Sequence, residues 1–281
     1  MNDAAWTCSV FGVRMPRIIY GTAWKENRTA ELVELAISMG FRGIDTACQP
    51  KHYDEPGVGE GLARCLKRGV SRDSLYLQTK FTPLAGQDPA RVPYDPDASL
   101  AQQVAQSCEV SLRNLGAEYL DGLLMHSPLQ QPEATLEAWR AMEDLFHSGT
   151  VRQLGLSNCY DLARFKGLWE AVKVKPAVLQ NRFYADTGYD RALRAYCVEN
   201  GVIYQSFWTL TANPKLLADS TVTGLAARYG RTPAQILFRC LTQIGIVPLS
   251  GTTRESHMRE DLAIFEFELK GDELVAVTAL L

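Results

Sequence analysis

The sequence predicts a single α/β domain over residues 1–281, built as a (β/α)8 barrel with an N-terminal β-hairpin. Short apolar segments alternate eight times with helical patterns, and no linker rich in Pro, Gly or Ser interrupts them. Eight strands that are each followed by a helix, with right-handed connections, close into a barrel. An open doubly wound sheet is the alternative fold, but no G-x-G-x-x-G loop follows the first predicted strand.

The predicted strands are short apolar runs bounded by turn residues. A hairpin around Phe11-Gly12 precedes them and is expected to close one end of the barrel. The expected strands are 17–24, 41–47, 75–81, 120–128, 151–158, 176–183, 202–209 and 246–250.

The predicted helices carry apolar residues at helical spacing. Thr29 is expected to cap the first helix and Gly40 to end it. In the segment 99–116, Val104, Cys108 and Leu112 fall on one helical face. The other expected helices are 58–69, 132–148, 161–172, 189–201, 220–230, 232–245, 256–265 and a tail over 272–281.

Composition narrows the class of protein. The chain is 46% hydrophobic with a net charge of −3, which allows a large core and argues against nucleic-acid or membrane-surface partners. No apolar run reaches the roughly 20 residues of a membrane helix, and the first residues do not resemble a signal peptide. We therefore expect a cytoplasmic protein, either a monomer or a weak homo-oligomer.

Cysteine and histidine spacing predicts no metal site. The seven cysteines form no C-x-x-C pair, and the four histidines show no i, i+4 pairing. We expect the cysteines to be reduced thiols that pack as small hydrophobes.

Four side chains capable of proton chemistry stand at or just beyond the ends of three successive strands: Asp45, Tyr53, Lys80 and His126. Each alone has an ordinary structural explanation, as a helix cap, a loop aromatic, a surface charge or a core histidine. Parallel strands, however, bring their C-terminal ends to one face of a barrel. A carboxylate can then hold the ammonium, and the ammonium can lower the pKa of the tyrosine from about 10. The tyrosine would act as general acid, and the histidine would polarise a carbonyl oxygen.

Motifs along the chain support this reading. Gly21-Thr22, GIDTA, QTKF, LMHSP, LGLSN, LQNRF, VPLSGTT and HMREDL resemble, in order and spacing, the aldo-keto reductase superfamily from about Met15 to Phe267. The resemblance implies reduction of an aldehyde or ketone, or the reverse alcohol oxidation, by hydride transfer with a nicotinamide dinucleotide. It places the catalytic roles on Asp45, Tyr53, Lys80 and His126.

The resemblance also implies a cofactor site. Ser157, Asn158 and Gln180 would bind the nicotinamide carboxamide, and Phe207 would stack on its ring. The full implied set is Gly21, Thr22, Asp45, Ser157, Asn158, Gln180, Phe207, Trp208, Leu210, Ser250, Gly251, Thr252, Thr253, His257, Glu260 and Asp261. The resemblance implies NADP(H) as the cofactor. NAD(H) stays open because Leu249 stands where the family usually has a phosphate-binding lysine.

The sequence departs from the family between Asp45 and Tyr53, where residues 49–52 form an apparent insertion. Short loops predict an open substrate site, with the proline-rich segment 82–99 as one wall. Trp24, Phe81 and Trp208 are expected to line the mouth, with Tyr94 as a further candidate.

Three alternatives remain open. A nicotinamide-binding regulatory subunit would bind nucleotide without turnover. A redox-neutral natural-product enzyme could use the same acid–base pair. An aldolase-like lyase could use Lys80 as a Schiff-base lysine, which borohydride trapping would reveal.

Overall fold

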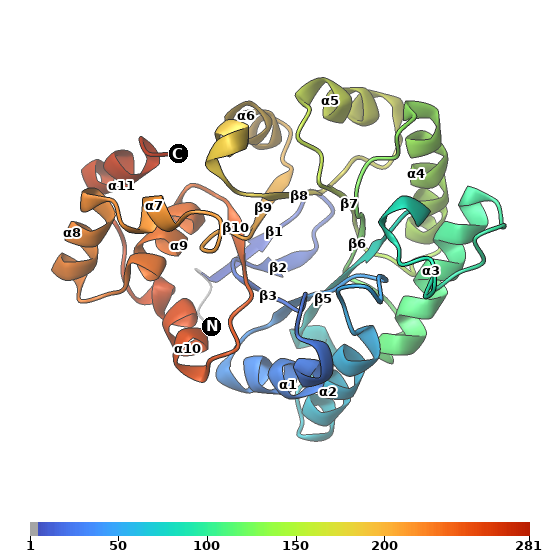
Figure 1. Ribbon diagram of the computed structural model, residues 1–281, viewed down its shortest axis with the longest axis horizontal. Coiled ribbons are helices and arrows are strands. Elements are labelled where there is room, and N and C mark those ends of the chain that lie inside the picture. Colours follow the sequence, from blue (N-terminus) through green and yellow to red (C-terminus); the bar gives the residue numbers. More distant parts are fainter. Residues whose placement is uncertain (1–4) are drawn as a thin grey trace.

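The barrel predicted from the sequence is present in the computed structural model, which describes residues 5–281. Eight parallel strands close in the order β10-β3-β4-β5-β6-β7-β8-β9, surrounded by helices (Figure 1). The strands are β3 (Ile19–Gly21), β4 (Gly43–Asp45), β5 (Tyr76–Phe81), β6 (Gly122–Met125), β7 (Leu154–Ser157), β8 (Val178–Arg182), β9 (Ile203–Phe207) and β10 (Val247–Ser250).

The predicted hairpin is confirmed. Strands β1 (Trp6–Cys8) and β2 (Arg14–Pro16) pair antiparallel and lie behind the barrel centre in the view of Figure 1. Met15 is fully buried in an apolar cluster with Ile19, Tyr76 and Val247, the first residues of three barrel strands. The hairpin therefore closes the N-terminal end of the barrel and leaves the C-terminal end open.

The helices form the outer ring in Figure 1. Their bounds are α1 (Thr29–Met39), α2 (Glu55–Lys67), α3 (Leu100–Leu115), α4 (Pro132–His147), α5 (Leu162–Ala171), α6 (Arg191–Glu199), α7 (Pro214–Leu217), α8 (Ser220–Tyr229), α9 (Pro233–Gln243), α10 (Glu255–Leu262) and α11 (Gly271–Thr278). Helices α8, α9 and α11 share a separate apolar cluster at one side of the barrel. No helix among residues 5–281 is long and apolar enough to span a membrane.

Two helix starts differ from the sequence prediction. A 3-10 turn at Glu26–Arg28 runs directly into α1, so Arg28 occupies the N-cap and Thr29 is already helical. Helix α2 begins at Glu55, three residues before the predicted start, because the Asp54 carboxylate accepts a hydrogen bond from the Gly57 amide.

Side chains along β5 alternate between the barrel interior and the helix layer. Gln78 and Lys80 point inward and hydrogen-bond to Asp45 on β4. Leu77 and Phe81 belong to the main apolar cluster between barrel and helices. This alternation decides which residues can reach the open end of the barrel.

Candidate active site

A cavity of about 1120 Å³ opens at the C-terminal end of the barrel. The strand ends that line it contribute Gly21, Asp45, Ser157, Asn158, Gln180, Phe207 and Ser250. Tyr53 and His126 also line it, so the structure brings these predicted residues together on one face. This is the barrel face on which catalytic groups are found.

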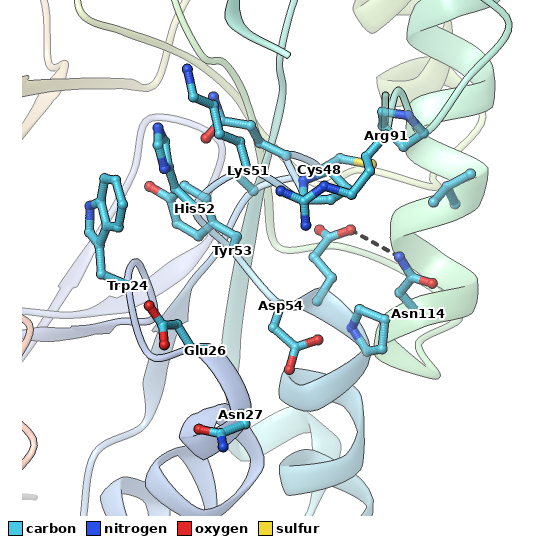
Figure 2. Close-up of a pocket in the computed structure, with 17 residues that line it drawn as sticks. Trp24, Glu26, Asn27, Cys48, Lys51, His52, Tyr53, Asp54, Arg91 and Asn114 are labelled. Atoms are coloured by element: carbon cyan, nitrogen blue, oxygen red, sulfur yellow. Dashed lines mark hydrogen bonds between the residues drawn. The ribbon is translucent and has the colours of Figure 1, made fainter. Parts of the chain in front are cut away.

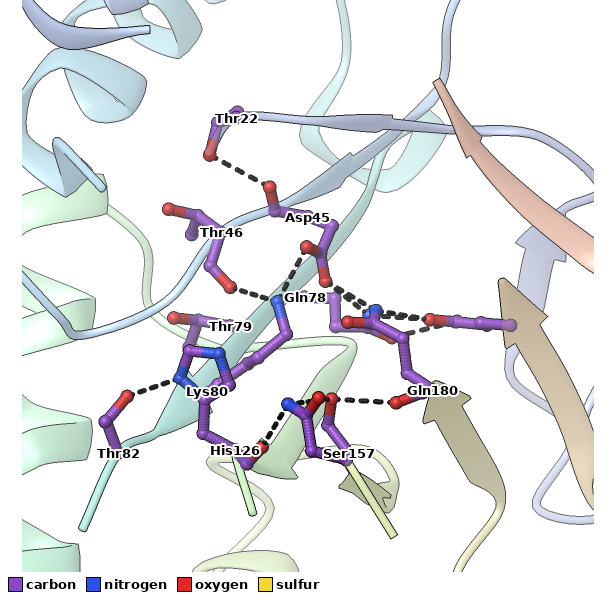
Figure 3. Close-up of polar contacts among 12 residues, drawn as sticks. Thr22, Asp45, Thr46, Gln78, Thr79, Lys80, Thr82, His126, Ser157 and Gln180 are labelled. Atoms are coloured by element: carbon purple, nitrogen blue, oxygen red, sulfur yellow. Dashed lines mark hydrogen bonds and ion pairs between the residues drawn. The ribbon is translucent and has the colours of Figure 1, made fainter. Parts of the chain in front are cut away.

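Asp45, which lines the cavity, forms an ion pair with Lys80, which does not (Figure 3). Lys80 Nζ lies 2.6 Å from Asp45 Oδ2 and 2.8 Å from the Thr46 carbonyl oxygen, and both charged side chains are almost fully buried. Burial lowers the pKa of Lys80, whereas the Asp45 charge raises it. The ammonium is therefore held as a structural and electrostatic partner of the carboxylate.

The other oxygen of Asp45 organises three glutamines. Oδ1 accepts hydrogen bonds from Gln78 Nε2 at 2.7 Å and from Gln180 Nε2 at 2.9 Å. Both amides also donate to Gln205 Oε1, at 2.9 and 2.8 Å. An ionised carboxylate only accepts hydrogen bonds, so it fixes which end of the Gln78 and Gln180 amides faces it. The remaining oxygen of Gln180 is left for a ligand in the cavity.

His126 follows β6 (Figure 3). Its Nδ1 lies 2.6 Å from the Thr82 hydroxyl, which fixes the ring and leaves Nε2 for the cavity. Burial, and next the Lys80 charge, lower the pKa of His126 to about 3. The imidazole is therefore neutral at physiological pH.

Tyr53 lies in the segment between β4 and α2, beside His52 and near Trp24 (Figure 2). Its ring centroid is 5.9 Å from that of His126, and Lys80 Nζ is 5.3 Å from the Tyr53 ring centroid. Burial, and next the Asp45 charge, raise the pKa of Tyr53 above its usual value. The expected lowering of the Tyr53 pKa by Lys80 is absent: burial sets the direction of the shift, and the Asp45 charge adds to it. Tyr53 is consequently a protonated phenol at neutral pH.

A second cavity of about 630 Å³ lies behind Tyr53, where Cys48 and Arg91 face it (Figure 2). Glu55, two residues after Tyr53, is 3% exposed at its floor. Its carboxylate accepts hydrogen bonds from Thr79 on β5 and from Ser111 and Asn114 on α3. Burial raises the pKa of Glu55, and these hydrogen bonds oppose the shift. Glu55 thereby ties the Tyr53 segment to the barrel and its helix layer.

Most residues implied for a cofactor line the larger cavity. Besides the strand-end residues already named, they are Trp208, Leu210, Gly251, Thr252, His257, Glu260 and Asp261. Thr22 does not line it; it is fully buried, and its hydroxyl donates to the Asp45 carbonyl oxygen. Thr253 lies next to the cavity lining rather than in it. Ser250 donates to Asp261 Oδ2 at 2.6 Å, and burial raises the pKa of Asp261 to about 6.

Two features of this region suit a phosphate group. Lys25 is 9% exposed and donates a hydrogen bond to the Gly251 carbonyl oxygen, and no carboxylate among residues 5–281 pairs with it. Burial lowers the pKa of Lys25. Helix α10 begins after Arg254 without a side-chain cap, so first-turn N–H groups are available to an anion.

Two of the three residues expected to contact the substrate line the cavity, and the third does not. Trp24 and Trp208 line the cavity, and both adopt a left-handed backbone with φ of 60° and 56°. Phe81, however, is fully buried and stacks near Tyr94, so it does not lie at the mouth. Because Lys80 points into the barrel, its neighbour Phe81 must point outward.

Sequence reasoning missed several site residues: Lys25, Gln78, Thr82, Arg182 and Gln205. A signal existed for the glutamines, because Gln78 and Gln205 interrupt apolar strands at inward-facing positions. No group of three or more His, Cys, Asp and Glu side chains in residues 5–281 could hold a metal ion, and the seven cysteines are free thiols.

Comparison with known proteins places the chain in a family. The model of the Aldo/keto reductase family matches residues 17–281. A glyoxal reductase of Bacillus subtilis (strain 168) is 30% identical over 271 residues, covering 96% of this chain and 90% of the relative. A methylglyoxal reductase of Yersinia pestis is 28% identical, with the same coverage of 96% and 90%.

Solved structures agree. An aldo-keto reductase of Bombyx mori in complex with NADP has a TM-score of 0.82 at 26% identity, covering 98% of this chain and 92% of its own. An aldo/keto reductase of Brucella melitensis has a TM-score of 0.82 at 26% identity, covering 98% of both chains. The chain belongs to the aldo/keto reductase family, whose members are oxidoreductases that bind NADP(H).

Proposed function

We propose that this protein reduces an aldehyde or ketone with NADPH, and that Tyr53 donates the proton. The observation that carries the proposal is the gathering of Tyr53, His126 and the Asp45–Lys80 pair at one wall of the larger cavity. The glyoxal and methylglyoxal reductases among its relatives support a small carbonyl compound as substrate.

The larger cavity fits a dinucleotide. Ser157, Asn158 and Gln180 would hold the carboxamide, and Phe207 would stack on the nicotinamide ring. Lys25 and the uncapped start of α10 would receive phosphate groups. When bound, the dinucleotide supplies the hydride for the carbonyl carbon. NADPH is the proposed form, with the Arg254 guanidinium or the His257 imidazole as the nearby hydrogen-bond donor that replaces the lysine missing at Leu249.

The chain's own residues then handle the proton. The neutral His126 ring, oriented by Thr82, would direct Nε2 at the carbonyl oxygen. The Tyr53 O–H bond breaks and its proton passes to that oxygen, leaving a phenolate near the Lys80 ammonium. Burial and the Asp45 charge keep Tyr53 protonated at neutral pH, so the phenol carries the proton that reduction of a carbonyl requires.

The Schiff-base alternative finds no support in the site. Lys80 Nζ is occupied by Asp45 and Thr46, and Lys80 is 1% exposed beneath the cavity rather than on its lining. We also propose that the protein works in the cytosol, where a reducing environment would keep its seven cysteines as free thiols. The single closed barrel supports one domain.

The test is a Tyr53→Phe variant, with Tyr119→Phe at the opposite end of the barrel as the matched control. Loss of the general acid should lower kcat by about 10²- to 10⁴-fold, while nicotinamide fluorescence reports unchanged NADPH affinity. Tyr119→Phe should leave both unchanged. Undiminished turnover of Tyr53→Phe would remove Tyr53 from the mechanism. Wild-type protein that binds NADPH but reduces no member of an aldehyde and ketone panel would favour the regulatory-subunit alternative. Parallel titration with NADH tests the cofactor assignment.

A further inference from the structure

Arg182 is the last residue of β8 and lines the larger cavity. It lies two residues beyond Gln180, on the same face of the strand, and pairs in register with Phe207 of β9. These neighbours place the guanidinium at the edge of the region proposed for the nicotinamide and the substrate.

The Arg182 guanidinium lies over two aromatic rings. Its central carbon lies 4.0 Å from the Trp208 ring centroid and 5.3 Å from the Tyr184 ring centroid. The backbone N–H of Arg182 donates to the Tyr160 hydroxyl, which in turn donates to Asn158 Oδ1. Stacking leaves the N–H edge of a guanidinium free to donate hydrogen bonds.

The backbone beside Arg182 is strained. Trp208 and Asn158 both adopt left-handed conformations, with φ of 56° and 53°; asparagine tolerates this region, whereas a bulky residue such as Trp208 adopts it at a cost. Trp208 nevertheless remains 46% exposed, so burial of its ring does not explain the conformation. Such strain concentrates where a structure holds groups ready for a ligand.

The Arg182 guanidinium has no hydrogen-bond or ion-pair partner in the part of the chain that the structure describes. By contrast, Arg164 donates to backbone carbonyls and Arg72 pairs with Asp121. The buried carboxylates of the cavity are engaged elsewhere, Asp45 with Lys80 and Asp261 with Ser250. A planar fork of N–H donors without a partner matches the two oxygens of a carboxylate or phosphate.

We propose that Arg182 is an anion-binding residue of this site, receiving carboxylate or phosphate oxygens of a ligand in the cavity. The anion is either the carboxylate of an oxo-acid substrate or a phosphate of the dinucleotide. This inference rests on the proposed function and adds to it a specificity for charged ligands.

The test compares Arg182→Met, which removes the charge and the fork, with Arg182→Lys, which keeps only the charge. Arg91→Met, at the smaller cavity, controls for general loss of positive charge. The substrates are butanal and 4-oxobutanoate, which differ by a carboxylate. If the substrate anion binds Arg182, Arg182→Met raises the KM for 4-oxobutanoate about 10- to 100-fold, leaves butanal unchanged, and leaves the Kd for NADPH unchanged. If the cofactor phosphate binds there, the Kd for NADPH rises about tenfold or more, and both aldehydes respond alike. Arg182→Lys should recover part of either loss.

A change of less than twofold in all these constants for Arg182→Met would overturn the proposal. Wild-type protein without turnover of either aldehyde would refute the proposed function instead. Arg182 is then still tested by equilibrium binding of NADPH and of 4-oxobutanoate, where an unaltered Kd for both in Arg182→Met again overturns the anion site.

Discussion

The buried Asp45–Lys80 pair makes a quantitative prediction for Lys80→Met. Removing the ammonium leaves a buried carboxylate whose Oδ2 has lost its donor, while Oδ1 keeps the amides of Gln78 and Gln180. Breaking a buried ion pair costs about 3–5 kcal/mol. Because Asp45 keeps two amide donors, we expect Lys80→Met to lose unfolding free energy at the lower end of this range, near 3 kcal/mol.

Asp45→Asn should cost more, near 5 kcal/mol, because the new amide group presents donors to the Lys80 ammonium as well as replacing a charged acceptor. The double variant removes both charges together. Its loss of unfolding free energy should therefore fall several kcal/mol short of the sum of the single losses.

Urea unfolding followed by circular dichroism at neutral pH measures these differences. An Arg28→Met variant at the exposed Arg28–Glu31 pair, with side chains 50% and 62% exposed, should leave the unfolding midpoint unchanged. The reasoning is refuted if Lys80→Met loses less than about 1 kcal/mol of unfolding free energy. It is also refuted if the sum of the two single losses equals the loss of the double variant to within about 0.5 kcal/mol. If a single variant fails to fold while the double variant folds, the double variant again loses less than the sum of the single variants, as expected.

Three further predictions concern packing and pH. Gly59→Ala on α2 should destabilise the protein by about 1–3 kcal/mol, because the new Cβ would lie 2.0 Å from the Asn114 carbonyl oxygen. In the same urea assay the control Gly167→Ala, whose Cβ would have no atom within 4 Å, should stabilise the protein by about 0.5–1 kcal/mol. The unfolded state protonates His126 near pH 6.5 but the folded state only near pH 3. Between these two pH values, wild-type stability should fall with decreasing pH by about 1.4 kcal/mol per unit more than that of His126→Asn, and equal slopes there would contradict this. Thr82→Val frees the His126 ring, so kcat should fall several-fold with NADPH affinity unchanged, and an unaltered kcat would show that the hydroxyl does not orient the ring.

The sequence could predict residues whose position depends only on strand order. Asp45, Lys80 and His126 each stand at a strand end, and parallel strands bring such ends together wherever the exact boundaries fall. The prediction for Phe81 was wrong because side chains alternate between the two faces of β5, and a strand end alone does not say which face a residue occupies. Lys80 facing Asp45 already requires Phe81 to face the helices.

Other features required the three-dimensional arrangement. The glutamine network joins β4, β5, β8 and β9, and its contacts depend on the stagger of strands around the barrel, which no local pattern specifies. The direction of the Tyr53 pKa shift depends first on how deeply the phenol is buried and next on how close Asp45 lies, and the sequence contains neither. The partnerless guanidinium of Arg182 could be recognised only after every neighbour had a position.

The attachment of Glu55 to Thr79, Ser111 and Asn114 has a consequence for loop engineering and for divergence within the family. Tyr53 is held from its N-terminal side as well, because its amide donates to the Gln49 carbonyl oxygen and the Gln49 side chain donates to the Gly86 carbonyl oxygen. With Gln49 and the length of the connection kept, the side chains of residues 50–52 can be exchanged to alter what enters the active site, while the proton donor keeps its place.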